Sequence, residues 1–141
     1  MDYSALKNEL QNDPTSLGYA AFLNAGAYSP VTALLNETRG TISIDRDLLE
    51  SYEIINATVP AEWGSLSAAE KQRYQTVTGA GKVDPRNANV RATFQAMFAG
   101  GTQTRANLTA LLTRNGSRAE QLFGADVVVT AEDIAKALRE G

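Results

Sequence analysis

The chain has 141 residues, of which 43% are hydrophobic and 21% are charged, and its net charge is −3. These proportions are ordinary for one globular domain and argue against disorder, a membrane span or a secretory signal. The chain contains neither cysteine nor histidine, which excludes disulfides, thiolate chemistry and the commonest general base and metal ligand. We therefore expect a protein that is not an enzyme, holds no metal or other cofactor and does not enter a membrane.

The first forty residues predict three short helices. Leu6 and Leu10 recur at helical spacing behind Asp2, a side chain suited to capping a helix N-terminus. A second apolar segment, residues 17–25, predicts a short helix that ends at a glycine. Ser29-Pro30 then supplies a capping hydroxyl followed by proline at the first helical position.

One stretch near the middle of the chain predicts a strand. Thr41–Ile44 alternates and is β-branched. Asp45 or Asp47 can cap the helix that follows. We expect the inward face of that helix to consist of four apolar residues, Leu48, Leu49, Tyr52 and Ile55.

The rest of the chain predicts further short helices separated by clear stop signals. Two Ser-x-x-Glu capping boxes occur at residues 67–70 and 117–120, and Thr130 begins the last helix in a similar way. Asp84-Pro85 predicts another start, and Thr102 opens a helix that we expect to end at Asn115-Gly116. The expected fold is all-α: a compact single domain over residues 1–141, with about eight short helices and at most one or two short extended or β segments.

Charge is distributed unevenly along the chain. Residues 71–118 hold eight basic residues and one acidic residue, a net charge of +7, whereas the rest of the chain is at −10. Three interpretations follow: loose pairing of solvated faces within one fold, complementary surfaces that meet between neighbouring molecules, or a basic surface for nucleic acid. The overall acidity disfavours nucleic acid as a partner.

If complementary surfaces meet between molecules, the sequence predicts which residues lie at the interface. The candidates are the acidic cluster, the single tryptophan and the arginines of the basic stretch: Asp45, Asp47, Glu50, Glu53, Trp63, Arg86, Arg91, Arg105, Arg114 and Arg118. We predict no catalytic or metal-binding residue. A carboxylate-only hydrolase is the remaining enzymatic alternative, because Glu62 beside Trp63 has surroundings that could raise its pKa.

Several segments resemble small, mostly helical proteins of tailed bacteriophages, which are encoded among the genes for virion parts and morphogenesis. The resemblance covers nearly the whole chain and rests on packing, capping and turn residues. The residues are Leu6-Lys7, Asp13-Pro14, Leu17–Ala20, Leu34–Asn36, Arg39, Pro60–Trp63, Leu66-Ser67, Ser117–Gly124, Val129 and Asp133-Ile134. This resemblance implies a virion or assembly protein that binds copies of itself or other virion proteins.

The functional prediction is a non-enzymatic structural component of the phage particle. We expect it in the neck or tail, at or near the head–tail connection, assembled in the cytoplasm of the bacterial host and then present in the virion. The acidic segment around residues 45–53 would meet arginines within residues 86–118 of a neighbour. The alternatives are a small phage-encoded inhibitor or regulator that binds a host protein and, with less support, a DNA-binding regulator.

Overall fold

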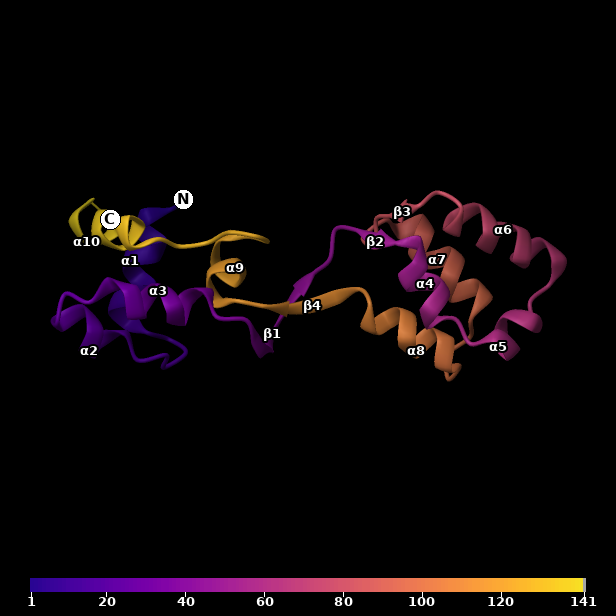
Figure 1. The fold of residues 1–141 in the computed structure, drawn as a ribbon, viewed down its shortest axis with the longest axis horizontal. Helices are drawn as coiled ribbons and strands as arrows, with labels where there is room; N and C mark the ends of the chain where they lie inside the picture. Colours follow the sequence, from indigo (N-terminus) through magenta and orange to yellow (C-terminus); the bar gives the residue numbers. More distant parts are fainter. Residues whose placement is uncertain (141) are drawn as a thin grey trace. The chain divides into compact units, whose positions relative to one another are not determined.

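The computed structural model describes residues 1–140, and helices make up most of this part of the chain (Figure 1). The predicted helical character is confirmed. The fold is not strictly all-α, however, because the described residues form ten helices and also two small sheets of two strands each. The number of helices predicted from the sequence, about eight, was therefore too low.

The described chain divides into two compact units. The terminal unit combines Met1–Ile44 with residues 115–140, and the inserted unit is Asp45–Arg114. The two boundaries fall within strands β1 (Arg39–Asp45) and β4 (Thr113–Gly116), which pair with each other. The sequence predicts one domain over residues 1–141 because no segment has the composition of a linker, and the strands at the two boundaries do not have it either.

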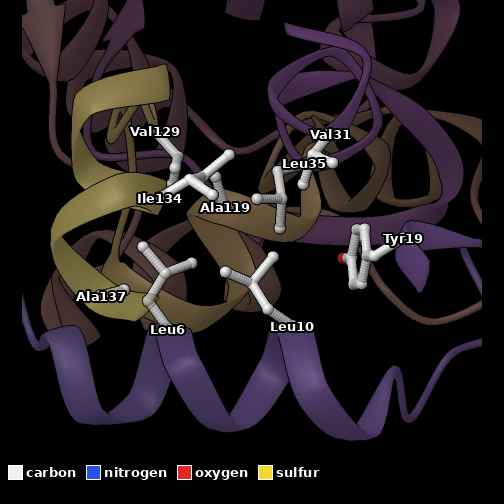
Figure 2. Close-up of a cluster of buried hydrophobic side chains, with 9 residues drawn as sticks. All are labelled: Leu6, Leu10, Tyr19, Val31, Leu35, Ala119, Val129, Ile134 and Ala137. Carbon is white, nitrogen blue, oxygen red and sulfur yellow. The ribbon is translucent and has the colours of Figure 1, made fainter. Parts of the chain in front are cut away.

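The terminal unit is a group of five helices built from both ends of the chain. They are α1 (Tyr3–Asn12), α2 (Tyr19–Asn24), α3 (Tyr28–Asn36), α9 (Arg118–Phe123) and α10 (Ala131–Glu140). Figure 2 shows Leu6 and Leu10 of α1 pointing toward Ile134 and the other side chains of this core. All three are at most 2% exposed, and each such burial stabilises the fold by about 1.5–3 kcal/mol.

The inserted unit has its own core, formed by a contiguous stretch of chain. Its elements are β2 (Leu49–Glu50), α4 (Ser51–Ala57), α5 (Pro60–Gly64), α6 (Ala68–Thr78), β3 (Lys82–Val83), α7 (Ala88–Met97) and α8 (Gln103–Ala110). Strands β2 and β3 are antiparallel, with Leu49 opposite Val83. Tyr74 belongs to this core and makes edge-to-face contacts with Phe94 and Phe98, each with ring centroids 6.5 Å apart. Each unit is therefore stabilised by its own set of apolar contacts.

Many of the predicted helix caps are confirmed. The Asp2 side chain accepts a hydrogen bond from Ala5 N, and both Ser-x-x-Glu boxes form with their reciprocal hydrogen bonds. Thr102 and Thr130 accept from backbone N–H groups of α8 and α10. These caps were predictable because each depends only on residues within one turn of the helix.

Three predicted helix starts were wrong. Helix α3 begins at Tyr28, ahead of Ser29, and α7 is capped by Asn87 and not by Asp84. Helix α4 is capped by Glu50 in a box with Glu53, so neither Asp45 nor Asp47 caps it. In the last case residues 49–50 belong to a strand, and pairing with β3 delays the helix start to Ser51.

That delay also overturns the predicted inward face of α4. Leu49 and Ile54 are buried, whereas Leu48, Tyr52 and Ile55 are 39%, 63% and 53% exposed. A helical repeat counted from residue 48 assigns the wrong face, because the residues before Ser51 are extended.

The helix that was predicted to end at Asn115-Gly116 ends earlier, at Ala110. Gly116 lies instead in β4, and its φ angle is not positive. A Cβ atom at this position would collide with the side chain of Ile44. This glycine is therefore needed for close packing beside β1 and does not terminate a helix.

Candidate functional site

A surface pocket of about 170 Å³ lies in the inserted unit. Its walls are mostly apolar and come from five elements and the segments beside them. Its apolar lining includes Leu49 of β2, Ile54 of α4, Val83 of β3, Phe94 of α7 and Leu108 of α8. Pairing of β2 with β3 places Leu49 and Val83 opposite each other, which positions two of these walls.

Two arginines line the same pocket, Arg91 from α7 and Arg105 from the first turn of α8. The Arg91 Nε donates a hydrogen bond to the carbonyl oxygen of Pro85. Within residues 1–140, the Arg105 guanidinium makes no hydrogen bond, and neither arginine forms an ion pair. A half-buried guanidinium on an apolar pocket is well suited to binding a carboxylate from another molecule.

The four predicted acidic residues do not form one free cluster. Glu50 and Glu53 belong to the capping box of α4. Glu53 also forms a two-pronged ion pair with Arg46, with N–O distances of 2.9 and 3.0 Å. The hydrogen bond from Arg46 lowers the pKa of Glu53 below its ordinary value. Only Asp45 and Asp47 have exposed side chains.

Arg86 is exposed but has a partner within its own unit. Its Nε lies 3.1 Å from an Asp84 carboxylate oxygen, and this contact raises the pKa of Arg86. The charges of Asp45 and Asp47 raise that pKa further. The fold therefore brings the exposed acidic residues close enough to affect an arginine of the same chain.

Arg118 is not available to a partner. In the terminal unit its guanidinium donates two hydrogen bonds to the carboxylate of Glu9, at 2.8 and 2.9 Å. The Glu9 side chain is only 2% exposed and also accepts from the hydroxyl of Tyr19. Burial and the charge of Glu9 together raise the pKa of Tyr19 well above its ordinary range. Arg118 is therefore part of the internal structure. Arg114 lies half-buried in β4.

Trp63 is half-buried against the core of the inserted unit. Its ring lies edge-to-face with Tyr74 at 6.4 Å, and the Lys71 ammonium lies 4.8 Å from the ring centroid. The buried indole N–H has no hydrogen-bond partner within residues 1–140. These contacts pack the Trp63 ring against Tyr74 and Lys71 of the same unit.

Glu62 has surroundings opposite to those that the hydrolase alternative needs. Its carboxylate accepts hydrogen bonds from the Thr104 hydroxyl at 2.6 Å and from the backbone N–H groups of Gln103 and Thr104. These bonds lower the pKa of Glu62. The carboxylate thus caps the start of α8 across 42 residues of sequence, and it lacks the raised pKa that was suggested for a general acid.

Within residues 1–140 there is no group of three or more acidic side chains placed to hold a metal ion. No helix in this part of the chain has the length and apolar character needed to cross a bilayer. No family model, curated protein or solved structure matches the chain.

The pairing of Arg46 with Glu53 and of Arg118 with Glu9 was missed by sequence reasoning. The first pair had a local signal, since the two residues are seven positions apart and flank a helix start. The second pair joins residues 109 positions apart. Only the fold brings those two residues together.

Proposed function

We propose that the chain is a non-enzymatic structural component of a tailed-bacteriophage particle, located in the neck or tail. It would act through protein–protein contacts in an assembly that contains many copies. The proposal is supported by the resemblance of its packing and capping segments to small helical phage proteins. It is supported also by the pocket of the inserted unit, called here the arginine-lined pocket, whose lining includes Leu49, Ile54, Phe94, Arg91 and Arg105.

The pocket is the observation that carries the proposal. It combines an apolar surface with two guanidinium groups that form no ion pair within the described residues. Such a combination is typical of interface hot spots, where an apolar anchor enters a pocket and charges at its edge fix the orientation. The volume, about 170 Å³, is smaller than the roughly 300–1,000 Å³ of most small-molecule sites, which favours a partner's side chain as the occupant.

A single contact of this size is weak, and multiplicity compensates for that weakness. In an assembly each additional contact is effectively intramolecular, so modest interfaces hold when many copies are present. This reasoning favours a role as a repeated building block.

The test is mass spectrometry of purified particles from a phage that encodes this chain. We expect the polypeptide to be present in many copies per particle. Its absence from purified particles, together with recovery of a single host protein bound to it, would support a host-directed inhibitor instead. Binding to duplex DNA that weakens steeply with salt would support the regulator alternative.

Charge reversal tests the pocket within the same experiment. The double variant Arg91→Glu/Arg105→Glu should greatly reduce incorporation into particles. The control Arg73→Glu/Lys82→Glu changes the net charge equally at two exposed positions of the same unit and should be incorporated normally. Equal incorporation of both variants would show that the pocket is not the contact.

A further inference from the structure

The stretch from Asp45 to Ile55 exposes an unusual combination of side chains. Leu48, Tyr52 and Ile55 are the exposed apolar residues described above, at 39%, 63% and 53%. Asp45 and Asp47 on the same stretch are also exposed. An apolar anchor with carboxylates beside it is what the arginine-lined pocket is suited to bind.

The pocket and this stretch belong to adjoining segments of the inserted unit. Leu49 lines the pocket and directly follows Leu48 in the chain. Asp45 and Asp47 act electrostatically on Arg86, which follows the pocket residue Pro85. A molecule that carries both a pocket and the group that fits it can pair with a second copy of itself about a two-fold axis.

We propose that the partner in the pocket is a second copy of this chain. This inference rests on the proposed function in taking the pocket to be a protein contact. Leu48 of one copy enters the pocket of the other, and Asp45 and Asp47 pair with Arg91 and Arg105. Because each copy carries both the pocket and the acidic stretch, both contacts form in a closed two-fold dimer.

Charge complementarity is the reason for choosing a second copy over another protein. Arg91 and Arg105 form no ion pair within residues 1–140 of their own chain. Asp45 and Asp47 are the exposed members of the predicted acidic cluster. The two sets carry opposite charges and are therefore complementary between copies. Their pairing at an interface with reduced access to water is stronger than pairing in bulk solvent.

The first measurement is sedimentation velocity of the purified full-length chain over a wide range of concentration, at low and at high salt. We expect a monomer–dimer equilibrium that shifts toward monomer as salt screens the ion pairs. A monomer at every concentration and salt overturns the inference.

A charge swap gives the sharper test. Arg91→Glu/Arg105→Glu and Asp45→Arg/Asp47→Arg should each weaken self-association by about 100-fold or more, since like charges then face each other. Mixing the two variants should restore a dimer, because both contacts of the mixed pair are again complementary. A mixture that stays monomeric overturns the inference, and circular dichroism of each variant verifies that it folds.

A test variant and a matched control variant examine the apolar part of the contact. Leu48→Asp should weaken the dimer, whereas Val128→Asp, at a residue of the terminal unit that is 63% exposed, should leave it intact. Equal behaviour of the two variants would contradict the placement of Leu48 in the pocket.

The two proposals fail in distinguishable ways. A monomer in solution that is nevertheless incorporated through Arg91 and Arg105 would refute self-pairing and retain the virion role. A dimer that responds to the charge swap but is absent from particles would refute the virion role and retain self-pairing.

Discussion

The terminal and inserted units use arginine in different ways. In the terminal unit, Arg118 is 12% exposed at its side chain and pairs with Glu9, which is 2% exposed. In the inserted unit, Arg91 and Arg105 line a pocket and form no ion pair within the described residues. The difference shows that arginine-rich sequence does not by itself indicate a binding surface, because burial and the nearest carboxylate decide the role of each guanidinium.

The largest expected effect comes from breaking the internal pair of the terminal unit. Arg118→Met leaves the Glu9 carboxylate buried without its counter-ion and should reduce the free energy of unfolding by about 3–5 kcal/mol. Arg105→Met, in the inserted unit, should change it by less than about 0.5 kcal/mol. Urea denaturation measures both variants. Similar losses would mean that the two arginines have the same role after all.

Core truncation tests how independent the two units are. Ile134→Ala in the terminal unit and Ile54→Ala in the inserted unit remove side chains that are 0% and 1% exposed. Each should cost about 2–4 kcal/mol through lost packing and the cavity that remains. Hydrogen exchange should show the loss of protection mainly in the unit that carries the substitution. Equal loss in both units would indicate one cooperative domain, as the sequence predicted.

The two serine capping boxes allow a comparison of burial with the same local chemistry. Ser67 and Ser117 each accept a hydrogen bond of 3.1 Å from the N–H three residues on. Ser67 is exposed, whereas Ser117 is buried. Ser67→Ala should cost about 1 kcal/mol and Ser117→Ala about 1–2 kcal/mol, since water has less access to the part-buried Glu120 N–H that loses its partner. Thermal denaturation that reverses this order would contradict the assigned burial.

The smallest expected effect concerns pH. The pKa of Glu62 in the folded chain lies below its value in the unfolded chain. Its contribution to the free energy of unfolding is therefore present at neutral pH and is lost as the pH falls through the folded pKa. Glu62→Gln should therefore lower the melting temperature at pH 7, and the gap to the unmodified chain should close below the ordinary carboxyl range, about pH 4. Glu140→Gln, at an exposed carboxylate outside the proposed contacts, serves as the control. A gap that widens in acid would contradict the prediction.

Local features of the fold were predictable from the sequence, and the candidate site was predictable only in part. Caps such as Ser67 and Thr102 depend on residues within one turn, and their structure followed the pattern. Arg91 and Arg105 were among the predicted interface residues, but the pocket that joins them to Leu49 was not visible. Its walls come from β2, α4, β3, α7 and α8. A sequence pattern within one segment cannot predict that these five elements meet around a pocket.

The sequence by itself determined the helical character, the absence of cysteine and histidine chemistry and the position of many helix ends, because these depend on composition or on short-range hydrogen bonds. Only the tertiary structure decided which charges remain available. The +7 and −10 partition along the chain does not survive folding: the inserted unit holds eight basic and seven acidic residues, and the terminal unit holds five and nine. Charges separated along the chain become neighbours in space, and electrostatic interaction depends on distance in space and on burial.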